Sequence, residues 1–125
     1  MVKGIGIDIV DVKRFEVTRS DNNVQNQILT TNERNRAKKE AAPTAYTARI
    51  FAIKEAVVKA LGCGFNKGLL WHDIEVSEGD DVRLSGYFQN IAREKDVKKI
   101  HSTHSYSLNH IVALVVLEGQ TKESP

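Results

Sequence analysis

The chain has 125 residues, a length typical of one domain built round one hydrophobic core. Its composition, 41% hydrophobic and 27% charged, is that of an ordinary globular protein and excludes disordered and collagen-like classes. Eighteen basic and 16 acidic residues give a formal net charge of +2, too small to indicate nucleic-acid binding from charge alone. The single cysteine, Cys63, excludes an internal disulfide and a multi-cysteine metal site.

The longest uninterrupted apolar run, residues 111–117, is too short to span a bilayer. Residues 1–12 contain Asp8 and Asp11 and lack a small-residue cleavage site, so they do not resemble a secretory signal. We therefore expect a cytoplasmic protein with no membrane partner. We also expect one domain over residues 1–118, followed by a polar tail over residues 119–125.

Residues 4–10 predict a half-buried strand, because three isoleucines alternate in it with two glycines and an aspartate. We expect the isoleucine face to be packed. The opposite face carries Gly4, Gly6 and Asp8, so it leaves room for a close approach beside a carboxylate. This combination indicates a candidate site.

Two short helices are expected before residue 43. Asp11 is placed to cap a helix that carries Phe15. Thr30 and Glu33 have the spacing of a capping box. Residues 32–40 are almost wholly polar, which predicts a solvated helix that ends near residue 42 and adds little to the core.

The strongest pattern in the chain predicts a helix over residues 44–61, where apolar residues recur every three or four positions. Gly62 stands where a helix-terminating glycine belongs. The glycines of residues 62–68 predict a flexible loop.

The remaining elements are predicted to be a hairpin of strands 74–77 and 82–85, a helix running from Tyr87 toward Lys99, and strands 100–106 and 110–118. The last strand is continuously apolar, so we expect it to lie inside a sheet. The predicted fold class is α+β, with an antiparallel sheet packed against helices on one face.

Two carboxylates are the main candidates for chemistry. Glu55 precedes Lys59 by four residues, which is also the spacing of a simple surface ion pair. Asp8 could likewise be a capping residue at the end of a strand. Taken together, however, two acidic groups beside glycines repel each other unless a hard cation such as Mg²⁺ lies between them. Lys59 would then stand near the phosphates of a substrate.

Two segments of the chain resemble the signatures of a known family. GIGIDIVDVKRF at residues 4–15 and FAIKEAVVKALG at residues 51–62 are similar to those of holo-acyl-carrier-protein synthase, the small type of 4′-phosphopantetheinyl transferase. The resemblance implies the corresponding fold and the Mg²⁺-dependent transfer of 4′-phosphopantetheine from coenzyme A to a serine of apo acyl carrier protein. It also implies release of adenosine 3′,5′-bisphosphate, a role in fatty acid and lipid biosynthesis, and a homotrimer, because each signature occurs only once.

The resemblance also implies roles for particular residues. It implies that Asp8 and Glu55 are catalytic and bind the metal, and that the catalytic Lys59 contacts coenzyme A. The expected further contacts are Gly62 and Gly64 with the pantetheine or phosphates, Thr103 and His104 with the nucleotide, and Lys13 and Arg14 with the acidic carrier protein.

The sequence departs from the family pattern at two places. The family usually has arginine immediately before the phenylalanine of the second signature, whereas Ile50 stands there and Arg49 is one residue earlier. A shift of one residue moves a side chain by about 100° round the helix, so Arg49 is expected to point in a different direction from the family arginine. Near the C-terminus, His101 occupies a position that is usually serine.

Two alternatives remain at this point. The first is a small basic nucleic-acid-binding module that uses the lysine and arginine clusters, although no aromatic stacking motif accompanies them. The second is a non-catalytic subunit that keeps the fold. A zinc site built from the four histidines is disfavoured, because positions 101 and 104 face opposite sides of a strand.

Overall fold

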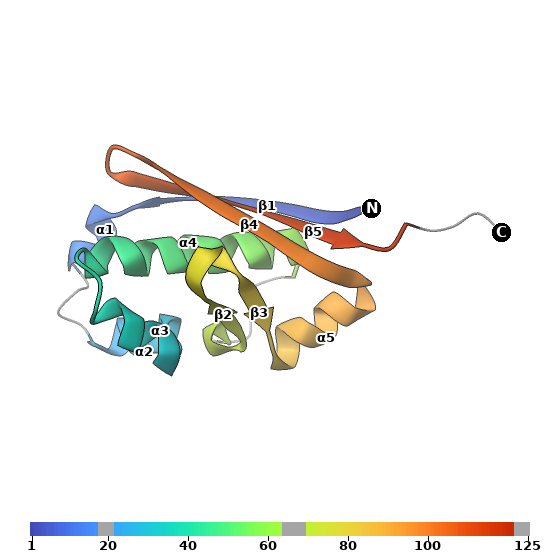
Figure 1. Ribbon diagram of the computed structural model, residues 1–125, viewed down its shortest axis with the longest axis horizontal. Coiled ribbons are helices and arrows are strands. Elements are labelled where there is room, and N and C mark those ends of the chain that lie inside the picture. Colours follow the sequence, from blue (N-terminus) through green and yellow to red (C-terminus); the bar gives the residue numbers. More distant parts are fainter. Residues whose placement is uncertain (18–21, 64–69, 122–125) are drawn as a thin grey trace.

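The computed structural model describes residues 1–17, 22–63 and 70–121. A three-stranded sheet lies on one side of a long helix, α4, and the smaller elements lie on its other side (Figure 1). Two 3-10 turns, Trp71–Asp73 and Glu78–Asp80, flank the first strand of the hairpin. The helices and strands are, in order, β1 (Val2–Asp11), α1 (Lys13–Val17), α2 (Asn22–Ile28), α3 (Thr31–Ala37), α4 (Pro43–Leu61), β2 (Ile74–Val76), β3 (Val82–Leu84), α5 (Gly86–Glu94), β4 (Val97–Ser107) and β5 (His110–Gly119).

The sheet has the strand order β1-β5-β4 and is antiparallel throughout, which confirms the predicted α+β class. The apolar strand β5 is central, as expected. Its alternate side chains are buried against α4, and they are Ile111, Ala113, Val115 and Leu117. The hairpin of β2 and β3 is also confirmed.

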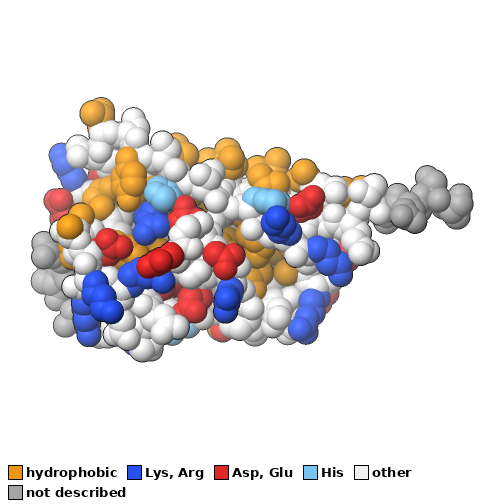
Figure 2. Space-filling model, in the orientation of Figure 1, with side chains coloured by type: hydrophobic (Ala, Val, Ile, Leu, Met, Phe, Trp, Pro, Cys, Tyr) orange, Lys and Arg blue, Asp and Glu red, His pale blue; other side chains and the backbone are white. Residues whose placement is uncertain are grey.

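The expected packing of β1 is wrong in one respect, because its two faces are exchanged. Ile5, Ile7 and Ile9 are 59%, 54% and 63% exposed. The face that α4 covers is the one with the glycines. Figure 2 shows hydrophobic side chains along the upper edge of the molecule, over the sheet. Because Gly4 and Gly6 have no side chains, the helix backbone can lie directly on this part of the strand.

Helix α4 is buried on most of its circumference because it lies between the sheet and the smaller elements (Figure 1). It ends at Gly62, whose φ of 69° is the left-handed conformation that glycine adopts easily, so the predicted terminus is confirmed. Within the described ranges, no helix is both long and apolar enough to cross a membrane.

The polar segment before α4 contributes more to the interior than its sequence predicts. The capping box of Thr30 and Glu33 is present. The Glu33 carboxylate, however, is 1% exposed, and its Oε1 lies 2.7 Å from the Nζ atom of the fully buried Lys54. The expectation that this segment adds little to the core is therefore wrong. Its helix also ends at Ala37, before the predicted end.

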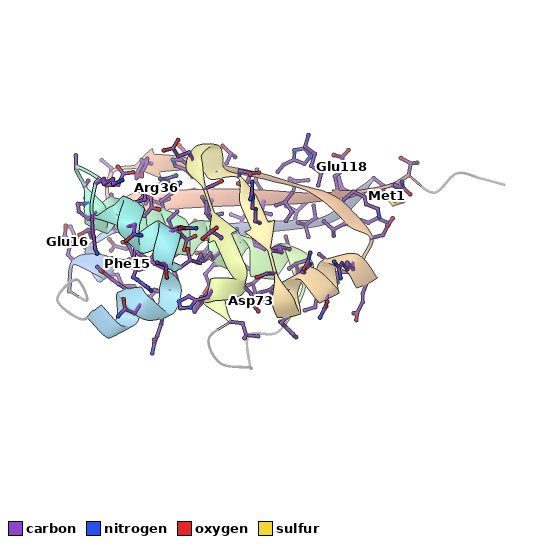
Figure 3. All side chains as sticks on the ribbon, turned by 60° about the horizontal axis from the view of Figure 1, so that its bottom comes forward. Met1, Phe15, Glu16, Arg36, Asp73 and Glu118 are labelled. Atoms are coloured by element: carbon purple, nitrogen blue, oxygen red, sulfur yellow. The ribbon has the colours of Figure 1, made fainter. Side chains whose placement is uncertain are left out.

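Helix α5 is shorter than predicted. It ends at Glu94, because Asp96 has a φ of 58° and β4 begins at Val97. At the other end of α5, Asp73 accepts a hydrogen bond from the backbone N–H of Tyr87 at 3.3 Å (Figure 3). Met1 and Glu118 lie at the same end of the sheet (Figure 3), and the amino group of Met1 donates to the carbonyl of Gly119 at 3.0 Å. Of the expected tail, residues 122–125 lie outside the described residues.

Candidate active site

Asp8 is brought to α4 by the glycines that precede it on β1. A Cβ atom on Gly6 would lie 2.7 Å from the backbone nitrogen of Ala60, and closer still to the carbonyl oxygen of Ala56. Only glycine allows this approach, because a real Cβ atom needs more room. The strand and helix backbones are therefore in contact two residues before Asp8.

Lys59 of α4 meets Asp8 directly. Its Nζ atom lies 2.9 Å from Asp8 Oδ1 and 3.2 Å from the carbonyl oxygen of Ile7. The Lys59 side chain is 53% exposed, whereas the Asp8 side chain is 13% exposed. Lys59 thus forms its ion pair with Asp8 of β1. The alternative from the sequence, a surface ion pair between Lys59 and Glu55, is not the pair that is observed.

Glu55 lies in the electrostatic field of Asp8. Burial raises the pKa of Glu55, and the negative charge of Asp8 raises it further, whereas the positive charges of Lys59 and Arg14 lower it. The hydrogen bond to Asp8 raises the pKa of Lys59. Asp8, Glu55 and Lys59, which were predicted to act together, therefore lie at one place, where α4 crosses β1.

As donors, Asp8 and Glu55 are of the chemical type that a magnesium ion accepts. Mg²⁺ is commonly held by one or two carboxylates, with waters and substrate phosphates as its other ligands. In residues 1–17, 22–63 and 70–121, no group of three or more histidine, cysteine, aspartate or glutamate side chains is placed to hold a metal ion.

Helix α1 places Arg14 against α4, close enough to Glu55 for its charge to lower the pKa of that carboxyl. The Cζ atom of Arg14 lies 5.9 Å from the centre of the Phe51 ring, four residues before Glu55. Asp11 Oδ1 accepts a hydrogen bond from the backbone N–H of Lys13 at 3.0 Å, as expected for a capping residue. Lys13 and Arg14 are both exposed.

His104 and Asp8 lie in one row across the sheet. Both are paired with Ala113 of the central strand, on the face that α4 covers. Two strand spacings separate their Cα atoms by about 10 Å. Thr103 is instead paired with Leu114 and faces the opposite side of the sheet. The two expected nucleotide contacts therefore do not lie together within one chain.

Sequence reasoning missed Asp80, which is the partner of His104. The side chain of Asp80 is hydrogen-bonded to His104 Nδ1 and lies 2.6 Å from Nη1 of Arg49. Arg49 is thus directed toward His104, whereas Ile50 is completely buried. The turn pattern of residues 78–81 gave no sign of these contacts, because the partners are distant in the sequence.

The glycine loop is described only at its start. Gly62 is exposed at the end of α4, and a Cβ atom there would lie 3.6 Å from Lys95 Nζ. Gly64 lies outside the described residues. Burial raises the pKa of the Cys63 thiol, which does not favour a reactive thiolate.

Comparisons with known proteins show the family of the chain. The model of the 4′-phosphopantetheinyl transferase superfamily matches residues 4–115. A holo-[acyl-carrier-protein] synthase of Geobacter metallireducens is 37% identical, over 94% of this chain and 98% of the relative. One of Desulforudis audaxviator is 34% identical, over 98% and 97% of the two chains.

Among solved structures, a holo-(acyl-carrier-protein) synthase of Bacillus anthracis in complex with CoA has a TM-score of 0.76 and 36% identity, over 96% of this chain and 99% of that one. An acyl carrier protein synthase of Plasmodium yoelii with ADP bound has a TM-score of 0.82 and 26% identity, over 97% and 98%. The fold and the family model thus define a 4′-phosphopantetheinyl transferase. Within that superfamily, the chain belongs to the holo-acyl-carrier-protein synthase family.

Proposed function

We propose that the protein transfers the 4′-phosphopantetheine group from coenzyme A to a serine of apo acyl carrier protein and releases adenosine 3′,5′-bisphosphate. The observation that carries this proposal is the meeting of Asp8, Glu55 and Lys59 where α4 crosses β1. The relatives named for this activity, one of them in complex with CoA, support it. They also favour it over a nucleic-acid-binding module.

Asp8 and Glu55 would hold Mg²⁺ in this reaction. When bound there, the ion neutralises negative charge on the pyrophosphate of coenzyme A. The two carboxylates repel each other when both are charged. A bound cation would remove this unfavourable electrostatic interaction. This is a physical reason for their placement, since neither is needed to fill the core.

Lys59 is suited to contact the phosphate that leaves. Its charge lies at the end of a flexible and half-exposed side chain, and its bond to Asp8 raises its pKa and keeps it protonated. A lysine ammonium acts on a phosphate as a point charge, which offsets the negative charge that grows on the leaving group.

The rest of coenzyme A would lie in a cleft between subunits, because α4 covers the row that joins Asp8 to His104 within one chain. We assign the pantetheine or the phosphates to Gly62 and Gly64, and the nucleotide to His104. Because Thr103 faces the other side of the sheet, its contact with the nucleotide requires a cleft shared with a neighbouring subunit.

We propose a cyclic homotrimer for this reason and for a second one. Ile5, Ile7 and Ile9 form an exposed apolar strip on β1, beside Val112, Leu114 and Val116 on β5. Exposed patches of this kind mark sites of association. Sedimentation equilibrium should give about three times the 14.0 kDa chain mass, and Ile7→Lys should reduce it. A fully active monomer would refute the shared cleft, whereas an active dimer would refute only the threefold symmetry.

The carrier protein would bind at α1. Acyl carrier proteins of this system are acidic, and Lys13 and Arg14 are exposed beside the carboxylate site. Transfer to such a carrier would place the protein in cytoplasmic fatty acid and lipid biosynthesis.

The decisive experiment incubates the purified protein with apo acyl carrier protein, coenzyme A and Mg²⁺, and weighs the carrier by mass spectrometry. We expect a gain equal to one phosphopantetheine group, no gain with a carrier whose acceptor serine is alanine, and no gain after chelation of the metal. An unmodified carrier in the complete mixture would refute the activity. A salt-sensitive gel shift with nucleic acid would then favour the binding module.

A further inference from the structure

Three side chains from two elements converge on Asp80, which lies in the turn between β2 and β3. Arg49 of α4 approaches one carboxylate oxygen, and His104 of β4 approaches the other. The hydroxyl of Ser102, also on β4, donates to the backbone carbonyl of Asp80. The Asp80 side chain is only 9% exposed. One buried carboxylate thus joins the helix, the turn and the edge strand of the sheet.

The backbone of Asp80 is held in an unusual conformation. Its φ of 61° lies in the left-handed region, which residues other than glycine seldom adopt unless their surroundings hold them there. Here the side chain and the carbonyl are both anchored, so the turn is fixed against β4. A turn that only reversed the chain would need none of these contacts.

The bond to Asp80 orients the ring of His104. A carboxylate can only accept, so the proton of this hydrogen bond is on Nδ1, and Nε2 is the nitrogen left to meet a ligand. The ring is also held edge-on to Tyr106, with 5.5 Å between the ring centres. Both its tautomer and its orientation are therefore set before any ligand arrives.

Arg49 is held in the same way. One of its nitrogens is bonded to Asp80, and its Cζ atom lies 5.2 Å from the centre of the Tyr46 ring. A guanidinium has five N–H groups, so this bond leaves others for an anion. The Cα atoms of His104 and Asp8 stand about 10 Å apart across the sheet. Because α4 covers the row between them and Ala113 is fully buried, a ligand that meets both groups would contact Asp8 of one subunit and His104 of its neighbour.

We propose that Asp80 is a positioning residue, which orients Arg49 and His104 so that together they hold the nucleotide end of coenzyme A. This inference rests on the proposed function and adds two residues, Asp80 and Arg49, to it. Asp80 itself carries a negative charge, so it acts on the anionic ligand only through its two partners.

The test compares Asp80→Asn with Asp81→Asn, the exposed neighbour on the same turn. We expect Asp80→Asn to raise the Kd for adenosine 3′,5′-bisphosphate on the order of tenfold, by calorimetry, since one charged hydrogen-bonding partner is lost. The KM for coenzyme A should rise similarly, with little change in kcat or in the KM for the carrier. The ¹⁵N spectrum of the His104 ring should show a smaller fraction of the Nδ1-protonated form, because an amide can donate to Nδ1 as well as accept from it. Asp81→Asn should leave all of these quantities unchanged.

Ser102→Ala gives a second and milder variant, because it frees the turn without removing a charge. It should raise the same Kd by a smaller factor, and it decides the question if Asp80→Asn does not fold. An unchanged nucleotide Kd in folded variants would overturn the inference while the transferase activity stands. Absence of both nucleotide binding and transfer in the parent protein would instead refute the proposed function.

Discussion

Gly6 of β1 lies against the carbonyl oxygen of Ala56 in α4, so closely that a Cβ atom on residue 6 would overlap it. This contact explains why the two signature segments occur together. The strand supplies Asp8 two residues after Gly6, and the helix supplies Glu55 and Lys59 on either side of Ala56. The backbone contact therefore fixes the distance between the groups that carry the chemistry.

Gly6→Ala should damage both the fold and the site. We expect a loss of about 1–3 kcal/mol in the free energy of unfolding, since a rigid backbone contact is overpacked, together with weaker Mg²⁺ binding. Urea denaturation and calorimetry measure the two effects. Gly79→Ala is the control: it also adds a Cβ atom, at a φ of 73° but with no atom within 4 Å, so it should cost stability without changing Mg²⁺ binding. Equal metal binding in Gly6→Ala and the parent would contradict the argument.

Local patterns in the sequence were sufficient for most of the elements. The period of α4, its terminal glycine and the capping box each depend on residues a few positions apart. The side of β1 that is covered was not predictable in this way. An alternating strand shows two different faces, but its pattern does not say whether a helix or another subunit covers the isoleucines.

Contacts between distant residues were also beyond the sequence. Lys54 reads as an ordinary helix lysine, and only the fold brings it to Glu33, 21 residues earlier. Asp80 reads as a turn residue, yet its partners Arg49 and His104 are 31 and 24 residues away. The carboxylates could be proposed from the sequence because the two signatures that carry them occur together in one chain.

Removing either carboxylate should abolish metal-dependent transfer. Asp8→Asn and Glu55→Gln keep the size of the side chain but remove a charge that Mg²⁺ requires. We expect each variant to lose measurable Mg²⁺ binding by calorimetry and to lose activity, with an unchanged circular dichroism spectrum. Glu16→Gln, which removes an exposed carboxylate of α1, should change neither. Near-normal turnover in either site variant would show that the metal assignment is wrong.

Glu55 should make the metal-free protein less stable as the pH rises. Burial and the charge of Asp8 raise its pKa, so the folded protein holds this proton more tightly than the unfolded chain does. Its contribution to stability is therefore present below the ordinary carboxyl pKa and is lost as the pH rises through the folded-state pKa. At neutral pH without metal, Glu55→Gln should be at least as stable as the parent in urea denaturation. A clear loss of stability would contradict this reasoning.

Lys54, the residue before Glu55, should be essential for stability. Its Nζ atom donates to Glu33 Oε1 at 2.7 Å and to the carbonyls of Ile28 and Trp71 at 2.6 and 3.1 Å. Lys54→Met would leave a buried carboxylate without its cation, at a cost of about 3–5 kcal/mol. Combining it with Glu33→Gln should recover part of this loss, which a double-mutant cycle in urea measures. Simple additivity of the two substitutions would mean that the ion pair is not coupled.

Arg14 should act mainly on the carrier protein. Arg14→Glu replaces a cation beside the site with an anion, so the KM for apo acyl carrier protein should rise roughly tenfold, and more at low salt, where charges are least screened. Lys38→Glu makes the same change of net charge at an exposed residue after α3 and should leave this KM unchanged. The charge of Arg14 also lowers the pKa of Glu55, so the Kd for Mg²⁺ must be measured in parallel. A raised metal Kd with an unchanged KM for the carrier would place Arg14 in the metal site and move the docking surface away from α1.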